Sequence, residues 1–412
     1  MVLQLTNTLG GKKEVFEPLE AGKARLYGCG PTVKEPVHLG KFRSFLLADI
    51  LRRHLEYSGL SVTQVMNITD VGHLNEFEED AVEIAAARSG LHAWELVEKE
   101  EKAFHEVRHA LHIRDCHHYP HAREHIDDMI ALVQDLEAKG LTYKAGGNIY
   151  LDVHKVSDFG RLAGEPIQEL EARVSTPGAP PHSEKRSRLD IDLWRTDLAH
   201  SSHWPSPWGR GFPGWHVECV AMSRKYLGEF FDVHTGSHEN IFPHHDCEIA
   251  QAVALSGKPQ AGWWLHSGPV RVDGKPMSLE NDNVVKVREL LASGFRGSVL
   301  RVALLGAPYR EQLDFGEGIL EQARNRVNAV LGFHEHVRGE AGTAVPGKNP
   351  PPRWIEETEE RFRAALDNDL DYSGALDALT EQVDRLEPAT IGEPAQALKA
   401  LERWDQVLGI LD

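Results

Sequence analysis

The sequence predicts an α/β protein that combines a parallel sheet, an inserted subdomain and a helical bundle towards the C-terminal end. Two separate strand–helix–strand patterns and a helical periodicity beyond Asn283 predict this fold class. In the first pattern, an apolar run at residues 26–33 ends in glycines and a proline, residues 42–59 carry apolar positions at helical spacing, and residues 61–69 form a second strand. Such a unit forms a right-handed parallel crossover and is typical of nucleotide-binding folds.

The segment after the second strand predicts an inserted subdomain at about residues 80–200. Residues 80–139 are mostly helical in pattern and highly charged, and residues 146–153 favour a short strand. Residues 174–188 are rich in proline, serine and charge, which is typical of a surface loop. We therefore expect this part of the chain to lie at the periphery of the sheet.

A second α/β half follows, with a strand at 230–234, a helix at 244–256 and a strand at 263–272. The later periodicity is helical, and a proline-rich linker at 340–353 isolates a final segment. In that segment Leu401, Trp404 and Leu408 recur at helical spacing, which predicts the core of a bundle. The expected units are a sheet domain, a helical region and a bundle segment, at residues 1–283, 284–339 and 354–412.

Composition restricts the class of protein. The chain has 412 residues, 41% of them hydrophobic, which supports two or three packed domains. It shows no basic and apolar leader and no apolar run near the roughly 20 residues that span a bilayer, so we expect a cytoplasmic protein without a membrane partner. Its net charge of -18 argues against general coating of nucleic acid, although a local basic patch stays open. Four cysteines are too few for a secreted disulfide framework and favour metal binding or burial.

Four residues of metal-binding type stand where the fold can bring them together. His244 and Glu248 are four residues apart on a predicted helix, so their side chains share one face. Cys29 at the end of the first strand and Cys219 come from the two halves of the sheet. Thiolate, imidazole and carboxylate ligands together suit Zn²⁺. Each residue alone also fits an ordinary role, because single cysteines are usually buried as small apolar groups.

Longer strings add a family resemblance. CGPTV, HLGK, NITD, WPSPWGRGFPGWHVEC and FPHHDCEIAQ occur in the order found in cysteinyl-tRNA synthetases and in their shorter relative, the cysteine ligase of mycothiol synthesis. The resemblance implies the class I synthetase fold, a Rossmann-like parallel sheet, in an ATP-dependent ligase that uses L-cysteine and ATP with Mg²⁺. It also implies that a zinc ion binds the substrate thiolate directly. Its ligands are then the residues at the matching positions, Cys29, Cys219, His244 and Glu248.

A zinc ion explains how such an enzyme selects cysteine, because Zn²⁺ favours a soft thiolate and lowers its pKa, whereas the serine hydroxyl is a poorer ligand. Pocket shape alone separates the two amino acids less well. One departure from the family is Cys247, which replaces the usual asparagine and lies on the same helical face as His244. Cys247 is a possible competing ligand, and His245 is the other reserve candidate.

The string His38-Leu39-Gly40-Lys41 resembles the HIGH signature of class I synthetases, with lysine at its final position. The glycine lets adenine approach the backbone, the start of a helix favours phosphate, and His38 can donate to phosphate oxygens. The resemblance therefore implies that His38 and Gly40 bind ATP and that His38, Gly40 and Lys41 take part in catalysis.

The second signature, KMSKS, is degenerate in this chain. Met277 and Ser278 keep their places in the match as ATP-binding residues, and Ser278 is also an expected catalytic residue, but Leu279 stands where the second lysine is expected. Lys275, which lies one residue before the matching string PMSLE, is the other catalytic residue expected in this segment. A glutamate at position 280 repels triphosphate unless Lys275 or Arg271 supplies the missing charge. The altered loop argues against ordinary fast activation of ATP.

The amino-acid pocket is also altered. Glu239 occupies the position of the aspartate that binds the substrate ammonium in the family, so a carboxylate is kept with one more methylene. Thr69, Trp215 and His234 remain at the family's substrate-binding positions. Trp215 in the string GWHVEC favours the pocket floor, although an ordinary core position fits the residue as well.

The acceptor of the cysteinyl group stays open at this stage. The chain ends where full-length relatives continue into an anticodon-binding domain, and it is acidic, which slightly favours a small amine or another acceptor than tRNA. One alternative is a truncated cysteine–tRNA ligase that charges tRNA-Cys. Another is a non-catalytic paralogue that binds cysteine or nucleotide, because KMSKS is degenerate. A zinc hydrolase is disfavoured, since the protein ligands and a substrate thiolate leave little room for water.

Overall fold

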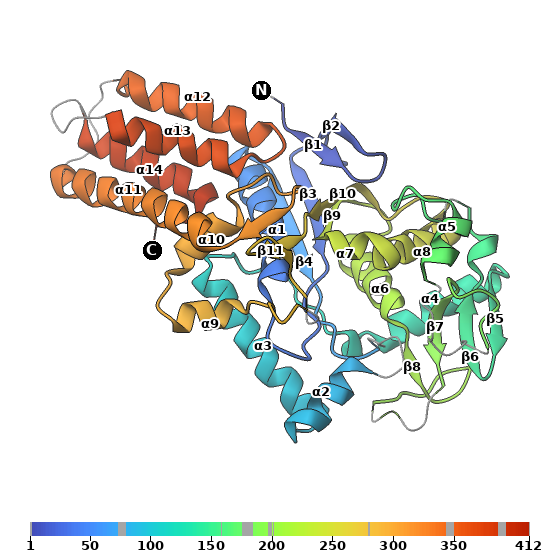
Figure 1. The fold of residues 1–412 in the computed structure, drawn as a ribbon. Coiled ribbons are helices and arrows are strands. Elements are labelled where there is room, and N and C mark those ends of the chain that lie inside the picture. The colour runs from blue at the N-terminus through green and yellow to red at the C-terminus, as the bar shows by residue number, and fades with distance from the viewer. Residues whose placement is uncertain are drawn as a thin grey trace.

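A computed structural model describes residues 2–72, 80–157, 159–174, 184–196, 200, 202–278, 281–342, 350–385 and 393–411. At its centre lies a four-stranded parallel sheet in the order β10-β9-β3-β4 (Figure 1). The two predicted α/β halves meet where β9 pairs with β3, which confirms the predicted parallel α/β sheet. The strands are β3 Lys23–Gly28, β4 Ser61–Met66, β9 Phe231–Ser237 and β10 Ala261–Ser267.

Helix α1 (Leu39–Tyr57) makes the crossover between β3 and β4 and is buried along most of its length. Its Phe42 and Phe45 rings lie 6.0 and 5.3 Å from the ring of Phe104 in the neighbouring helix α3. The helix is covered on several sides, which explains why its polar face is small. Because the strands are parallel, their carboxyl ends share one edge of the sheet, and α1 begins at that edge.

The chain between β4 and β9 holds a second, antiparallel sheet in the order β5-β6-β7-β8, seen at the right of Figure 1. The sequence predicts only the strand at 146–153, and the structure has a shorter one there that pairs with two neighbouring strands, one of which pairs with a third. Most of the proline- and serine-rich segment lies outside the described residues. The elements of this part are α2 Ala81–Ser89, α3 Ala93–Ala110, η1 Ala122–Glu124, α4 Ile126–Ala138, β5 Thr142–Ala145, β6 Asn148–Leu151, η2 Val153–Lys155, α5 Ile167–Arg173, β7 Ile191–Arg195 and β8 Phe212–Pro213.

The second half of the central sheet departs from the prediction at its helix. Helix α6 (Trp215–Leu227) leads into β9, and after the short α7 (His238–Asn240) the backbone takes a wide turn, η3 (Ile241–His245). Phe242 in that turn has a non-helical backbone conformation, so the regular helix α8 starts only at Asp246 and runs over Asp246–Ser256. The predicted start at residue 244 is therefore two residues early.

The remaining chain forms a small sheet and the helical bundle at the left of Figure 1. Parallel pairing of β11 with β13 joins the segments on either side of the expected boundary between residues 283 and 284. An N-terminal hairpin lies beside β10. The elements are β1 Gln4–Asn7, β2 Lys12–Val15, β11 Val270–Val272, β12 Lys275–Pro276, β13 Leu313–Phe315, α9 Val287–Ala292, α10 Gly297–Leu304, α11 Glu317–Ala341, α12 Arg353–Asp367, α13 Tyr372–Arg385 and α14 Pro394–Leu408.

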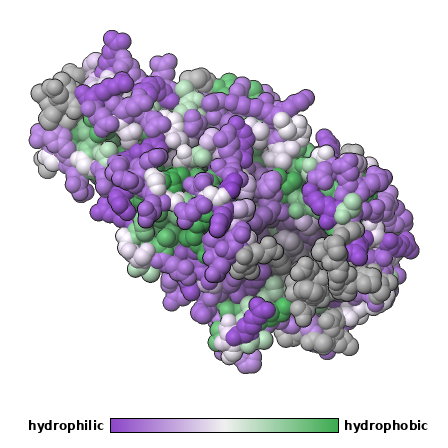
Figure 2. All heavy atoms as spheres, viewed as in Figure 1, coloured by the Kyte–Doolittle hydropathy of each residue, from purple (hydrophilic) through white to green (hydrophobic). Residues whose placement is uncertain are grey.

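Two apolar cores hold these parts together. One joins α1, α10 and the bundle, and it contains Leu401, Trp404 and Leu408, which confirms the predicted bundle core. The other lies between the central sheet, α6 and the inserted sheet. The face shown in Figure 2 is mostly hydrophilic, with apolar residues gathered in a few places near the middle of the molecule. None of the described helices combines the length and the apolar character that crossing a membrane requires.

Candidate metal and nucleotide site

Cys29, Cys219, His244 and Glu248 converge at the carboxyl edge of the central sheet. Their ligand atoms all lie within 4.8 Å of one another. Cys219 Sγ is 3.5 Å from His244 Nε2, and that nitrogen is 3.1 Å from Glu248 Oε1. Cys29 Sγ is 3.7 Å from the same carboxylate oxygen. The segment after β3, helix α6, the turn η3 and helix α8 each contribute one side chain. His244 therefore lies just before the helix that carries Glu248, and not on that helix as predicted.

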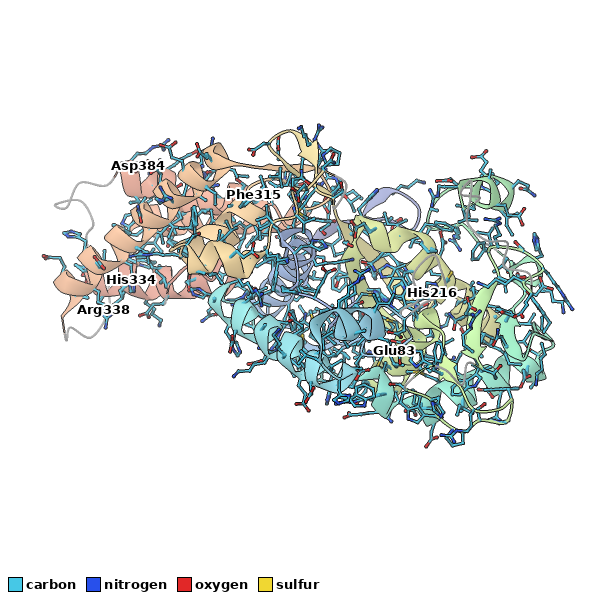
Figure 3. All side chains as sticks on the ribbon, turned by 60° about the horizontal axis from the view of Figure 1, so that its bottom comes forward. Glu83, His216, Phe315, His334, Arg338 and Asp384 are labelled. Carbon is cyan, nitrogen blue, oxygen red and sulfur yellow. The ribbon has the colours of Figure 1, made fainter. Side chains whose placement is uncertain are left out.

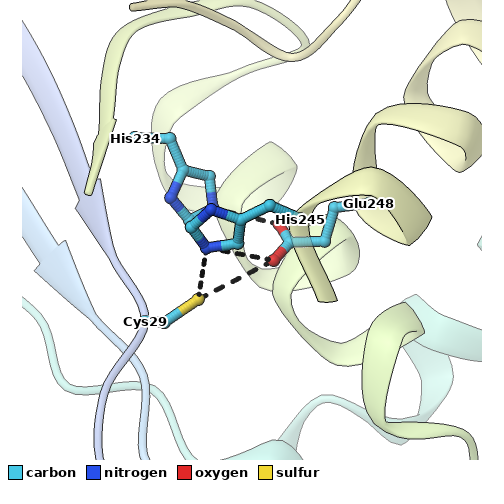
Figure 4. Close-up of side chains that lie close together, drawn as sticks. All are labelled: Cys29, His234, His245 and Glu248. Carbon is cyan, nitrogen blue, oxygen red and sulfur yellow. Dashed lines mark hydrogen bonds and ion pairs between the residues drawn. The ribbon is translucent and has the colours of Figure 1, made fainter. Parts of the chain in front are cut away.

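A second group of side chains shares two members with the first. Cys29, His234, His245 and Glu248 also offer ligand atoms within 4.8 Å of one another (Figure 4). His245 Nε2 lies 3.2 Å from Cys29 Sγ, while its Nδ1 lies 2.8 Å from His266 Nε2. His245 therefore faces Cys29 with one ring nitrogen and the buried His266 with the other. Cys247 belongs to neither group and is buried in the apolar core around α6.

The two oxygens of Glu248 face different partners. Oε2 lies 3.0 Å from His234 Nε2 and accepts a hydrogen bond of 3.0 Å from Gln260 Nε2. Oε1 faces His244 and Cys29. All of this carboxylate is buried, so a fixed orientation leaves one oxygen for the centre of the cluster.

His244 is oriented by two neighbours that precede Cys219 on α6. The indole of Trp215 stacks on its ring with the centroids 4.1 Å apart. His216, labelled in Figure 3, places its Nδ1 2.9 Å from His244 Nδ1. Burial lowers the pKa of His216 to about 4, which keeps that ring neutral at pH 7. These contacts leave His244 Nε2 facing Cys219 and Glu248.

The two thiols of the cluster resist ionisation on their own. Burial raises the pKa of Cys29, and the hydrogen bond with Cys29, followed by burial, raises the pKa of Cys219 well above its usual value. Two adjacent thiolates and a carboxylate in a buried site require a positive charge between them. Two sulfurs, one imidazole nitrogen and one carboxylate oxygen within this distance fit the donor set of a Zn²⁺ site. The residues present therefore fit the ion that the resemblance implies.

The cluster opens onto a cavity of about 320 Å³ that also receives the start of α1. Residues of the predicted metal site and residues of the predicted ATP and amino-acid sites line this one cavity. They are Cys29, His38, Lys41, Thr69, Trp215, Cys219, Glu239 and His244. His234 and Glu248 lie behind the wall, fully buried, so a direct contact between His234 and substrate stays a prediction.

The HLGK segment forms the entry to α1. His38 is the residue that precedes the helix, and its buried Nδ1 has no hydrogen-bond partner among the described residues. Burial, assisted by the Lys41 ammonium, lowers the pKa of His38. A Cβ atom added at Gly40 would lie 3.2 Å from His38 Cε1 and from Met277 Cε, so glycine permits this close approach. Met277 thereby reaches the start of α1.

Lys41 points back to the loop after β9. Its Nζ donates to Ser237 Oγ at 3.0 Å and to Asn240 Oδ1 at 3.5 Å, and it lies 3.4 Å from Glu239 Oε2. Ser237 and Asn240 are buried, whereas the Glu239 side chain is 72% exposed. The residue predicted to bind the substrate ammonium thus already has a cationic neighbour in the same cavity.

The KMSKS-like segment is only partly described, because residues 279 and 280 lie outside the described residues. Lys275 is exposed in β12 and does not line the 320 Å³ cavity. The Ser278 amide donates to Asn283 Oδ1 at 2.9 Å, and its hydroxyl accepts from the Asn281 amide at 3.2 Å. The Arg271 guanidinium donates to the carbonyl of Gly274. These contacts order the turn next to Met277.

Several residues of the site escape the sequence analysis. Asn67 lines the cavity, accepts from the Gly30 amide at 3.0 Å and donates to Thr69 Oγ1 at 3.0 Å. A Cβ atom at Gly30 would lie 1.6 Å from the carbonyl oxygen of Asn67, so only glycine fits. Both residues stand inside the strings CGPTV and NITD, which is the signal that could have indicated them. His216 and Gln260 act through tertiary hydrogen bonds that no spacing predicts.

Comparison with known proteins settles the family. The family model for the catalytic domain of class I (C) tRNA synthetases matches residues 15–325. A cysteine–tRNA ligase of Thermococcus onnurineus is 37% identical over 393 residues, which cover 92% of this chain and 79% of that relative. The chain belongs to the class I cysteinyl-tRNA synthetase family. The cysteine–tRNA ligase of Thermus thermophilus is likewise 37% identical, over 99% of this chain and 85% of its own length.

Solved structures confirm the class I fold. A methionyl-tRNA synthetase of Mycobacterium tuberculosis in complex with methionyl-adenylate superposes with a TM-score of 0.64 at 14% identity, over 94% of this chain and 90% of that one. A structure described as a putative arginyl-tRNA synthetase of Campylobacter jejuni gives a TM-score of 0.57 at 12% identity, over 95% and 92% of the two chains. Membership of the cysteinyl family makes this chain an ATP-dependent ligase. The predicted family, fold class and enzyme class are therefore confirmed.

Proposed function

We propose that this member of the family activates cysteine with ATP and Mg²⁺ to cysteinyl adenylate and transfers the cysteinyl group to tRNA-Cys. One observation carries the proposal, namely that the cluster of Cys29, Cys219, His244 and Glu248 opens onto the same cavity as His38 and Lys41. A thiol at the cluster and a triphosphate at the start of α1 are then neighbours. The reacting carboxylate and α-phosphate lie between them.

Cys29, Cys219, His244 and Glu248 are the proposed ligands of Zn²⁺. When bound, this ion supplies a Lewis acid that takes the substrate thiol as thiolate and disfavours serine. Trp215, which stacks on His244, forms the wall beside the substrate side chain. Thr69 also lines the cavity, where Asn67 donates a hydrogen bond to its hydroxyl.

The start of α1 is the proposed ATP site. His38 and the Lys41 ammonium line the cavity and offer donors to phosphate oxygens. Gly40 does not line the cavity, and its lack of a side chain leaves room for His38 and Met277; we keep it as a proposed ATP-binding residue. Met277, at the edge of the KMSKS-like turn, packs against this point, and Lys275 and Ser278 lie beside it on the same turn. We propose that these three residues complete the ATP site when the turn closes on the triphosphate.

Glu239 is the proposed partner of the substrate ammonium. Its carboxylate pairs with Lys41 in the structure, so substrate has to share it with that cation. His234 is assigned a positioning role, because its Nε2 faces Glu248 Oε2 behind the cavity wall. We keep residues 1–283 as the proposed catalytic unit, with an insertion at about 80–200 and helical units at 284–339 and 354–412.

The curated relatives favour tRNA-Cys over a small amine as acceptor. They are cysteine–tRNA ligases that align with 92% or more of this chain. The slight preference for a small amine that the sequence suggests has no support from these relatives. It remains the second outcome of the experiment below.

The experiment combines two assays on the zinc-loaded protein. Cysteine-dependent exchange of pyrophosphate into ATP measures activation, and transfer of labelled cysteine to tRNA-Cys measures the acceptor step. We expect both activities, with Cys219→Ala losing zinc and exchange, and with Cys247→Ala, a buried cysteine outside the cluster, retaining them. Absence of exchange in the wild-type protein contradicts the proposal. Exchange without any charging of tRNA points to a small acceptor.

A further inference from the structure

A second cavity lies away from the proposed active site, between the turn that joins α9 to α10 and the first half of α11. It has a volume of about 350 Å³. Its wall combines two arginines, an asparagine and a phenylalanine with small residues, and none of its side chains lines the active-site cavity. The residues are Ser293, Gly294, Phe295, Arg296, Val299, Arg324 and Asn328.

The wall of this cavity is basic in a chain that is acidic as a whole. The protein has 63 acidic and 45 basic residues, excluding histidine. Arg296 and Arg324 line one cavity, yet none of the described carboxylates pairs with either guanidinium within 4.0 Å. No acidic residue lines the cavity. Two cationic residues on the wall of one cavity, without an acidic residue beside them, favour an anion there.

The two guanidinium groups are held by different elements. Arg324 lies on α11, and its guanidinium carbon is 5.7 Å from the ring centroid of Phe295, whose face supports a cation. Asn328 follows one turn later on the same face of α11 and adds an amide donor. Arg296 comes from the other wall, directly before α10. Residues that carry donors therefore line this cavity from two walls.

We propose that this cavity is a binding site for a phosphate group. Planar guanidinium groups present paired donors that match the oxygens of a phosphate, and an amide adds a further donor. The same chemistry recognises a backbone phosphate of an RNA and the phosphate of a small molecule. The site is independent of cysteine activation, because none of its residues belongs to the proposed active site.

Arg324→Glu tests the site against Arg338→Glu. Both arginines are exposed on α11, and neither has a carboxylate partner among the described residues. The two positions are 14 residues apart on one helix, which corresponds to about 21 Å. Figure 3 shows Arg338 near the far end of the bundle. The variants thus change the net charge equally, and only one alters the cavity.

Two titrations of the full chain separate the sources of phosphate. In the first, binding of a tRNA-Cys transcript is measured at several salt concentrations. We expect Arg324→Glu to raise Kd about 10-fold and to lower the salt dependence by about one phosphate contact, while Arg338→Glu changes Kd less than about 2-fold. In the second, inorganic phosphate is titrated into protein labelled with ¹⁵N-arginine, and we expect saturable shifts of arginine side-chain signals that Arg324→Glu abolishes.

Each outcome decides the question. Loss of RNA binding in Arg324→Glu assigns the site to an RNA phosphate, and loss confined to the phosphate titration assigns it to a small phosphorylated molecule. Equal behaviour of Arg324→Glu and Arg338→Glu in both titrations overturns the proposal. Pyrophosphate exchange, measured beside them, stays unchanged in both variants and reports on cysteine activation separately.

Discussion

Glu248 shows how a single side chain connects the buried interior to the proposed zinc site. One oxygen faces His234 and Gln260, and the other faces His244 and Cys29. The carboxylate cannot rotate without breaking a buried hydrogen bond, which costs about 1–3 kcal/mol. The orientation of this proposed metal ligand is therefore fixed by two residues outside the proposed ligand set.

The first prediction concerns this outer contact. Gln260→Leu removes the donor to Glu248 Oε2 and should lower zinc affinity about 10-fold or more, because partners behind a ligand fix its orientation. Competition with a chelator measures the affinity. Gln251→Leu is the matched control, since this equally buried amide donates to the Cys247 carbonyl and not to the cluster. Equal zinc affinity in the two variants would count against the role of Gln260.

The second prediction concerns Gly40. Gly40→Ala places a methyl group 3.2 Å from His38 Cε1 and from Met277 Cε, so these two side chains have to shift away from the start of α1. We expect kcat/KM for pyrophosphate exchange to fall at least about 10-fold, since small displacements of reacting groups are costly. Gly332→Ala on α11 meets no atom within 4 Å and should leave exchange unchanged. A Gly40→Ala enzyme of normal activity would contradict the proposed ATP site.

The proposed zinc ligands were accessible to sequence reasoning because they stand in strings that carry the family resemblance. In addition, Cys29 follows a strand, and His244 and Glu248 keep helical spacing. His216 and Gln260 were not accessible, because their roles arise from contacts with residues 28 and 12 positions away. Asn67 is an intermediate case. It stands in the string NITD, which carries the family resemblance, but the string alone assigns no function to this residue. Residue type and spacing thus predict direct ligands better than the residues that orient them.

At the scale of elements, strands with distant partners were the hardest to predict. Strand β7 pairs with β6 about 40 residues earlier, and β8 pairs with β7 through two residue pairs only. Neither segment has a long alternating pattern of its own. In contrast, β3, α1 and β4 form a continuous local unit whose apolar runs predicted the parallel crossover. The turn η3 shifted the start of α8 but kept His244 and Glu248 on one side.

The third prediction concerns how α3 is attached to the loop after β4. His121 bridges Asp70 and Glu101, and its hydrogen bond to Asp70 is the main cause that raises the pKa of His121 to about 9. A raised pKa in the folded state stabilises the protein fully below the unfolded value of about 6.5, and this contribution is lost as pH rises towards 9.

Denaturant unfolding of the wild-type protein and His121→Gln between pH 6 and pH 9.5 measures this contribution. The difference in free energy of unfolding should be largest at the low end and should shrink steadily towards pH 9. His109→Gln, at an exposed histidine of α3, serves as the control. A difference that does not depend on pH would contradict the ion-pair bridge.

At the scale of the whole molecule, buried charges join the bundle to the catalytic sheet. The guanidinium of Arg301 on α10 lies 2.7 Å from Asp49 of α1 and donates to the carbonyl of Leu408 at the end of α14. Arg53 adds a second bond to Asp49 and one to the Gln406 carbonyl. The helix that begins with HLGK is thereby fixed to the last turn of the bundle.

The fourth prediction tests this junction. Arg301→Met leaves Asp49 with one buried cation and leaves the Leu408 carbonyl without this donor, so we expect a loss of about 3 kcal/mol in the free energy of unfolding. Arg361→Met removes an exposed ion pair with Glu381 and should cost less than about 1 kcal/mol. Equal losses of unfolding free energy in the two variants, measured by denaturant unfolding, would show that the buried junction stabilises the protein no more than an exposed ion pair does.

The central claim is that the cluster of Cys29, Cys219, His244 and Glu248 holds a metal ion that binds the thiol of cysteine. Replacement of zinc by Co²⁺ gives a direct spectroscopic measurement, because thiolate-to-cobalt charge-transfer absorption grows with each thiolate bound. We predict that cysteine increases this absorption saturably, that serine leaves it unchanged, and that Cys219→Ala loses the metal. Unchanged absorption on addition of cysteine to the cobalt-loaded protein would contradict the claim.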